Sequence, residues 1–170
     1  YAMDAAMNGA LGNVALGYST LSSITTGDYN VGVGINSGRL ISTGGQNIFM
    51  GRDTGYVMAS GSNNVAIGDS VFYHSMGAGN NTIIGASAGY NLTTGNNNVF
   101  MGYKAGYAQK TQGNVIAIGY EAMGGTAGTN EGYDIAIGYR SMFNAKDGAN
   151  GTALGNSALE NYIGTNSVAV

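Results

Sequence analysis

The chain contains no cysteine, no proline and no tryptophan, and only 9% of its 170 residues are charged. Without cysteine there are no disulfides and no thiolate metal sites, although this absence is compatible with any compartment. A typical soluble domain has about 25% charged residues. Asparagine, serine, threonine and glycine must therefore supply most of the polar surface.

Positive charge is also scarce, and long apolar runs are absent. The lysines and arginines form no cluster and the net charge is −3, which leaves no electrostatic means of binding a phosphate backbone. We therefore expect no nucleic-acid partner. No apolar run approaches the roughly 18 residues that a membrane-crossing helix needs, so we expect no membrane insertion by this stretch of chain.

Glycine, in contrast, is abundant, and it closes a motif that recurs with a 17-residue period. One step is longer, from Gly119 to Gly138, and its two additional residues fall within 124–132. The closing glycines are Gly17, Gly34, Gly51, Gly68, Gly85, Gly102, Gly119, Gly138 and Gly155. Such a period predicts a repeat architecture, with these glycines as a structural ladder.

A three-residue apolar segment rich in β-branched residues precedes each closing glycine, and it is too short for a helix. These segments are 14–16, 31–33, 48–50, 65–67, 82–84, 99–101, 116–118, 135–137 and 152–154. A second short segment, such as 54–58, follows each glycine, and a turn with glycine and asparagine completes the unit. Two short strands and two corners in each repeat predict an all-β fold, a parallel β-solenoid.

We expect a single repeat domain over residues 13–170, with nine coils and the start of a tenth. Each coil is a 17-residue unit, apart from the one 19-residue unit that contains the longer step. Residues 1–12 are expected to be the end of a preceding coil or a linker. Because the chain begins at Tyr1 and stops within another copy of the motif, we expect it to be a fragment of a longer protein.

An asparagine stands directly before the apolar segment in each of the first six repeats. Stacked coils would align these residues as an amide ladder along one corner, and they are Asn13, Asn30, Asn47, Asn64, Asn81 and Asn98. The ladder is either a polar binding stripe or a set of corner hydrogen bonds. The usual role of asparagine in turns favours the second interpretation.

The first strand of each coil is apolar on both faces. Val65 and Ile67 point one way, and Ala66 points the other way, where other repeats carry Phe49 or Phe100. A strand with one solvated face would alternate apolar with polar residues. We therefore expect one face to fill the coil and the other to be covered by further copies of the chain, giving a symmetric homo-oligomer and specifically a homotrimer.

These repeats resemble a known family. The units at 13–17 and 64–68, Asn-Val-Ala-Leu-Gly and Asn-Val-Ala-Ile-Gly, resemble the head repeats of trimeric autotransporter adhesins, which are left-handed parallel β-rolls packed as trimers. The terminal residues 166–170 are still closer to that motif. The longer pattern at 94–98 and 102–107 is similar to repeats of bacteriophage long tail fibres.

The resemblance covers residues 13–170 and implies a structural role. The adhesin unit is usually shorter than the unit of this chain, and its second strand is small where this chain carries tyrosine, which favours the tail-fibre type. The implied function is a rigid segment of a virion tail fibre that presents a host-receptor-binding tip. The alternative is a bacterial adhesin head that binds a host or matrix surface directly, in which case the chain would be extracellular, at the cell surface.

We identify no catalytic, metal or cofactor site in the sequence, so we do not expect an enzyme. The single histidine, His74, stands where other repeats carry unrelated residues, which favours a variable surface position. Asp53 and Asp69 occupy nearby places in successive repeats, and with Arg52 we expect a solvated ion pair. The glycine-rich loop at 124–132 has oxygen ligands that suit a hard cation, but it lacks the calcium-binding repeat motif.

One tyrosine recurs at the same place in four successive repeats: Tyr56, Tyr73, Tyr90 and Tyr107. A stripe of this kind either contacts a host-surface glycan or protein, or packs as an aromatic ladder between coils or subunits. Its regularity favours packing.

Overall fold

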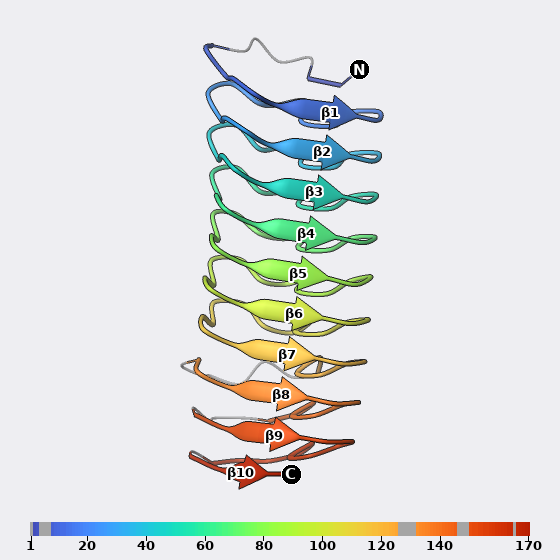
Figure 1. The fold of residues 1–170 in the computed structure, drawn as a ribbon, viewed down its shortest axis with the longest axis vertical. Helices are drawn as coiled ribbons and strands as arrows, with labels where there is room; N and C mark the ends of the chain where they lie inside the picture. The colour runs from blue at the N-terminus through green and yellow to red at the C-terminus, as the bar shows by residue number, and fades with distance from the viewer. Residues whose placement is uncertain (1, 4–7, 126–131, 146–149, 165) are drawn as a thin grey trace.

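A computed structural model describes residues 2–3, 8–125, 132–145, 150–164 and 166–170. Within these residues the fold is all-β and consists of ten short strands stacked one below another (Figure 1). The strands are β1 (Val14–Leu16), β2 (Val31–Val33), β3 (Ile48–Met50), β4 (Val65–Ile67), β5 (Thr82–Ile84), β6 (Val99–Met101), β7 (Ile116–Ile118), β8 (Ile135–Ile137), β9 (Thr152–Leu154) and β10 (Val168–Ala169). A search of the described residues for a helix long and apolar enough to span a bilayer finds none.

The strands form one sheet in which each strand pairs in parallel with the next along the chain. From β1 to β7 the paired residues are 17 apart, as Val65 and Thr82 are. Between β7 and β8 they are 19 apart, since Ile116 pairs with Ile135. The expected parallel solenoid with 17-residue coils is thus confirmed, and the two additional residues are accommodated outside the sheet.

The prediction of a second strand in each coil is wrong, because the described residues form a single strand in each coil. The segment after each closing glycine is a series of turns that still donates hydrogen bonds to the coil below. In coil 2, for example, Gly38 N–H bonds to the Thr54 carbonyl at 2.8 Å. Two residues of this segment, Asn36 and Gly38, have φ of 56° and 59°. Left-handed residues bend the chain too sharply for an extended strand.

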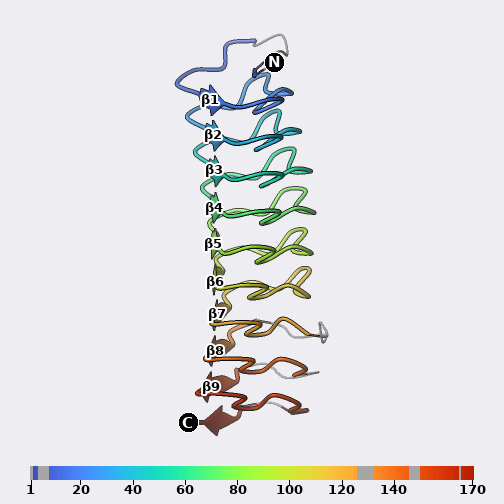
Figure 2. The same ribbon diagram turned by 90° about the vertical axis from the view of Figure 1, so that its right-hand side faces the viewer.

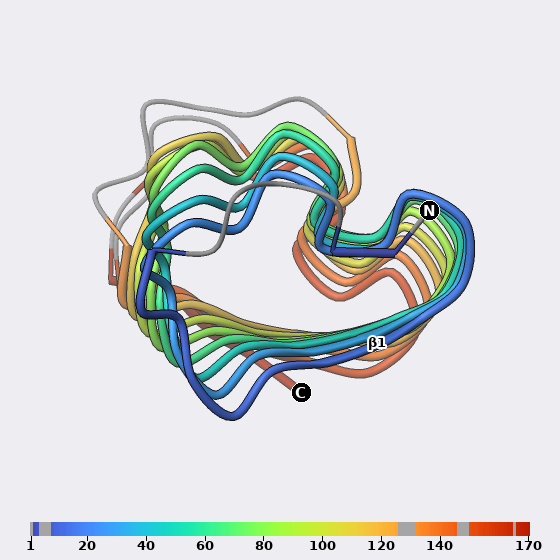
Figure 3. The ribbon, with the colours of Figure 1, turned by 90° about the horizontal axis from the view of Figure 1, so that it is seen from above.

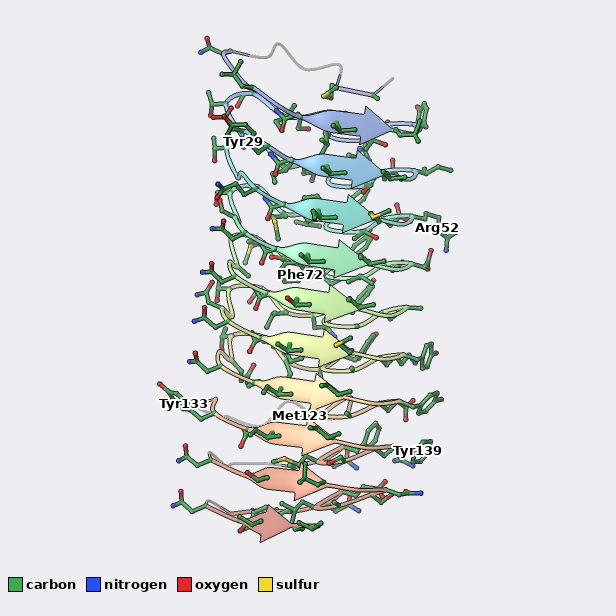
Figure 4. The ribbon with its side chains drawn as sticks, viewed as in Figure 1. Tyr29, Arg52, Phe72, Met123, Tyr133 and Tyr139 are labelled. Atoms are coloured by element: carbon green, nitrogen blue, oxygen red, sulfur yellow. The ribbon has the colours of Figure 1, made fainter. Side chains whose placement is uncertain are left out.

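The middle residue of each strand points into the coil, and its size is matched to a residue in the turn segment. Phe49 is fully buried, and a Cβ on Gly55 would lie 2.5 Å from its ring. In coil 7 the sizes are reversed, because Ala117 faces inward and Met123 fills the space. Met123 and its counterpart Phe72 both lie within the coils in Figure 4. Most coils therefore pair one large with one small core residue, whereas at β2 both Gly32 and Gly38 are small and Leu21 and Phe49 lie against Gly38.

The first and third residues of each strand point away from the coil. Val14 and Leu16 are 55% and 67% exposed, and Met50 and Met101 are also exposed. In β1 to β9 all of these flanking residues are apolar except Thr82 and Thr152. We call the flanking residues of these nine strands, together, the outer apolar face. The strands that carry this face lie along one long side of the molecule, and Figure 2 shows them end-on.

Viewed from above, each coil lies beneath the preceding one with only a small rotation (Figure 3). The molecule is therefore a column whose long axis runs perpendicular to its strands. Equivalent residues of successive coils form columns along this axis, and these columns carry the candidate site residues.

Candidate functional site

The six asparagines of the predicted ladder form a continuous column of side-chain hydrogen bonds. Asn64 is typical: its Nδ2 donates to Asn47 Oδ1 at 2.9 Å and to the Ala78 carbonyl at 2.9 Å. Its Oδ1 accepts from the Asn81 backbone N–H at 3.0 Å and from Asn81 Nδ2 at 3.1 Å. Asn30, Asn47, Asn64, Asn81 and Asn98 are buried. Each of these buried amides thus links neighbouring coils and is inaccessible to a ligand.

The ladder changes in the last coils. The backbone N–H of Val115 donates to Asn98 Oδ1 at 2.9 Å, and valine offers no amide to continue the series. The next position is Asp134, which is buried and accepts from the Gly151 N–H at 2.8 Å through one oxygen. Its other oxygen has no hydrogen-bond partner within the part of the chain that the structure describes. Burial accordingly raises the pKa of this carboxyl group above its ordinary value.

The closing glycines form a second column, and the close stacking of coils requires them. All nine have φ between 127° and 136°. A Cβ on Gly17 or on Gly34 would lie 2.5 Å from the carbonyl oxygen of the glycine one coil below. Both the backbone conformation and the space exclude a side chain here.

The predicted tyrosine stripe is a stack of nearly parallel rings. Centroids of Tyr56, Tyr73, Tyr90 and Tyr107 are 5.0–5.3 Å apart, with interplanar angles of 1–15°. All four side chains are half-buried, and burial raises the pKa of Tyr73. The Arg39 guanidinium lies 5.3 Å from the Tyr56 centroid, at one end of the stack.

A second tyrosine stack, which was not predicted from the sequence, lies at the edge of the outer apolar face. Tyr103, Tyr120 and Tyr139 are 42%, 45% and 49% exposed, and their centroids are 5.2 Å apart. Lys104 Nζ lies 5.3 Å from the Tyr103 ring and 5.4 Å from the Tyr107 ring, between the two stacks. The available signal was the recurrence of tyrosine directly after a closing glycine.

Groups near this second stack shift the pKa values of their neighbours. A hydrogen bond to Tyr103 raises the pKa of Lys104. The Glu121 carboxylate raises the pKa of the Tyr120 hydroxyl, because a second negative charge nearby is unfavourable. Both shifts raise a pKa that ordinarily lies above neutral pH, so they favour the protonated form of each group.

Two ion-pair clusters link successive coils. Arg52 Nε lies 2.7 Å from Asp69 Oδ1 and 3.8 Å from Asp53 Oδ2, which is the arrangement expected from the sequence. This hydrogen bond from Arg52 lowers the pKa of Asp69. Arg140 makes the second cluster, with Glu160 at 2.9 Å and Glu121 at 3.7 Å. Both are contacts between coils.

His74 is exposed and lies edge-on against two rings of the half-buried stack, with 5.0 Å between its centroid and those of Tyr73 and Tyr90. No group of three or more His, Cys, Asp or Glu in the described ranges is arranged to hold a metal ion. Most of the predicted cation loop, residues 126–131, lies outside the described residues.

The outer apolar face is the surface best suited to binding among the features above. It runs continuously over nine strands, whereas monomeric proteins rarely expose large contiguous apolar patches. A stable protein interface contains about 20–30 residues on each side, and two flanking positions on each of nine strands supply most of that number. The face can exclude water against another protein surface but offers no reactive group.

No family model, no curated protein sequence and no solved structure matches this chain.

Proposed function

We propose that the chain is a rigid segment of a fibre on a virion, of the bacteriophage tail-fibre type, and that it holds a host-receptor-binding tip away from the particle. The observation that carries this proposal is the column of equal coils with an apolar face along its whole length. Ten strands about 4.8 Å apart give a rod of roughly 45 Å. Further coils would lengthen the rod without any new type of contact.

The rod functions as a homotrimer in this proposal. The outer apolar face is too extensive to leave in water, and burying apolar surface contributes about 25 cal/mol per Å². Three copies arranged about an axis parallel to the rod would bury all three faces together and leave the polar corners in solvent. A trimer would also stiffen the rod, because no single column would bend independently.

The coils wind in the left-handed sense in this proposal, as in the adhesin-type repeats that the sequence resembles. The course of the ribbon supports this winding. In Figure 1 the strands run from left to right while the chain descends from its N-terminus to its C-terminus. Figure 3 places the strands on the front side of the column. Seen from above, the descending chain therefore turns counterclockwise, which is the left-handed sense.

Analytical ultracentrifugation and small-angle X-ray scattering test the assembly. We expect a mass three times the 17.2 kDa of one chain, and a maximum dimension no shorter than the stack of coils. A folded monomer at micromolar concentration would contradict the trimeric rod.

A bacterial adhesin head that binds a surface directly is the second candidate, favoured by the Asn-Val-Ala-Ile-Gly unit at 64–68. The DNA that encodes the flanking sequence distinguishes the two. A membrane-anchoring barrel after residue 170 identifies an adhesin, whereas a particle-attachment domain or a fibre-tip chaperone identifies a phage fibre. Antibodies against this segment would label virions only if the chain belongs to a phage fibre.

A further inference from the structure

The exposed tyrosine stack ends at a small residue. Tyr103, Tyr120 and Tyr139 belong to the column of residues that directly follow the closing glycines, and one coil before Tyr103 this column carries Ala86, which is exposed. Figure 4 shows this side of the molecule, with Arg52 and Tyr139 labelled. Ala86 therefore has only a methyl group at the level where another ring would continue the stack.

The Tyr103 ring is stacked on one side only. Tyr120 lies against it on the C-terminal side, with 5.2 Å between the centroids. Lys104 Nζ lies 5.3 Å from the Tyr103 centroid and interacts with the Tyr103 hydroxyl, at the end of the ring. The Glu121 carboxylate offsets the charge of this ammonium group. The face of the ring toward Ala86 is thus open.

The fold does not require aromatic residues in this column. The backbone carbonyls of the column accept the same hydrogen bond from the coil below, whatever the side chain is. Arg52, Ala86 and Tyr120 all do so, at 2.9, 3.0 and 2.8 Å. The exposed stack therefore adds aromatic surface that the turn itself does not need.

The half-buried stack shows what an end ring of this molecule binds. Arg39 stands one coil before Tyr56 in the same column, its Cζ lies 5.3 Å from the Tyr56 centroid, and its Nη1 donates to the Tyr56 hydroxyl. Arg140 likewise lies against Phe143, with Cζ 4.1 Å from the ring centroid. A guanidinium group is planar and weakly hydrated, so it stacks on an aromatic face more readily than an ammonium group does.

The charge next to Ala86 also favours a cation. Asp69 stands one coil before Ala86, and a hydrogen bond from Arg52 lowers the pKa of Asp69, so this carboxyl group is ionised at neutral pH. Its oxygens accept two N–H groups of Arg52 and the hydroxyl of Ser70. A carboxylate has about four acceptor positions, so Asp69 can accept one more donor.

This chain has no free arginine to place on the Tyr103 ring. Its arginines are Arg39, Arg52 and Arg140. Each of them already contacts a ring or a carboxylate of its own chain. A second copy of the chain would have the same arginines in the same contacts, so the cation must come from a different protein.

We infer that the open face of Tyr103 binds an arginine side chain of a different protein. The guanidinium group stacks on the ring at the level of Ala86 and donates a hydrogen bond to the Asp69 carboxylate. Stacked arginine and tyrosine pairs are frequent anchors of protein interfaces. The site belongs to a single chain, so it does not depend on the proposed trimer.

Saturation-transfer NMR tests the site with N-acetyl-arginine methylamide as the probe, observed on the probe itself. We expect saturable binding with a Kd on the order of 10 mM, as suits a single contact. The citrulline analogue has the same shape without the charge, and the lysine analogue has the charge without the plane. Both should bind at least about 5-fold more weakly. Equal binding of the citrulline analogue, or tighter binding of a methyl pyranoside, would overturn the inference.

Three variants locate the binding. Tyr103→Ala should weaken it at least about 5-fold, and Ala86→Arg should abolish it by placing a guanidinium on the ring from within the chain, as Arg39 does on Tyr56. Tyr139→Ala is the matched control at the other end of the stack, with similar exposure, and should leave the Kd unchanged. Melting curves verify that each variant is folded. Equal weakening by Tyr139→Ala, or no saturable binding to the folded wild-type chain, would show that the open face is not the site.

Discussion

The coils through β6 and those from β7 onward have the same backbone but different side-chain ladders. In the first region hydrogen bonds join five consecutive buried asparagines, through their side-chain amides or a backbone N–H, whereas the series then continues with Val115, Asp134 and Gly151 at the equivalent positions. Yet β7, β8 and β9 pair in the same register as the earlier strands. The parallel backbone ladder therefore defines the coil, and the asparagine column adds stability to a geometry that forms without it.

The core residues do not divide in this way. Around β3 and β6 the strand supplies a phenylalanine and the turn supplies glycine, whereas around β4, β7 and β8 the strand supplies alanine and the turn supplies phenylalanine or methionine. Either member of a pair can supply the large side chain, so the fold does not fix which one does. At β2 both members are glycine, and a Cβ on Gly38 would lie 2.7 Å from Leu21 and from Phe49 of the neighbouring coils.

Exchanging one arrangement of large and small core residues for the other should have the largest effect on stability. Phe100 is fully buried, and Phe100→Ala should cost about 3–5 kcal/mol of unfolding free energy, because a large cavity remains. Adding Gly106→Met to Phe100→Ala copies the Ala117–Met123 pair and should recover about 1–2 kcal/mol of that loss. Urea unfolding at fixed protein concentration measures both. If the double variant is less stable than Phe100→Ala, the two pairs are not interchangeable.

A break in the amide column should have the next largest effect. Asn64→Val places the valine of position 115 in the middle of the regular region and leaves the N–H of Asn81 and the carbonyl of Ala78 without their side-chain partner. The expected loss is about 2–4 kcal/mol, from missing hydrogen bonds and unsatisfied buried groups. Thr43→Val, an exposed substitution of similar character, should change stability by no more than about 0.5 kcal/mol. If both variants lost the same unfolding free energy, the asparagine column would make no specific contribution to stability.

Asp134→Asn restores an amide to the second region and should increase stability at neutral pH. Burial raises the pKa of Asp134 in the folded state, so its favourable contribution is complete below the unfolded-state pKa and is lost as pH rises through the folded-state pKa. The variant removes a buried negative charge at pH 7 and should gain about 1 kcal/mol, or a rise of about 2–4 °C in Tm. Melting curves at pH 7 and pH 3 should show the gain at pH 7 only. A gain that is the same at both pH values would exclude the carboxylate as its cause.

The ion pairs should give the smallest effects, and the two regions should differ. Each arginine lies near two carboxylates, but the Arg140 side chain is 32% exposed and the Arg52 side chain is 63% exposed. Arg140→Gln should therefore cost about 0.5–1 kcal/mol, and Arg52→Gln should give no resolvable change in Tm. Added salt should diminish the first effect. A larger loss for Arg52→Gln would reverse the expected order.

The sequence predicted the strands of the repeat because two independent signals agreed. The closing glycine marked the end of each strand, and β-branched residues marked its length, so the bounds Val65–Ile67 follow directly from the period. The second strand was wrong because periodicity reports which residues are equivalent but not their φ angles. The relevant signal was the mixture of Gly55, Phe72 and Gly89 at one equivalent position, since such a mixture indicates a left-handed residue.

The surface was less predictable than the core. The half-buried stack of Tyr56 and its equivalents was visible as a regular stripe, but the exposed stack at Tyr103 shares its column with Ile35 and Arg52 and has no regular pattern. The sequence also did not show which face of the strand points into the coil. Ala66 and Val65 are both apolar, so only the three-dimensional path shows that Ala66 points inward and Val65 outward.

The direction of the hydrogen bonds between coils has a mechanical consequence. They run along the long axis of the column, so a pull on its ends loads them one after another rather than all at once. A coil that detaches releases a 17-residue segment, which extends to roughly 60 Å, in exchange for a rise of about 4.8 Å in the stack. A column held at both ends would therefore lengthen in discrete increments under tension, and each increment would absorb work.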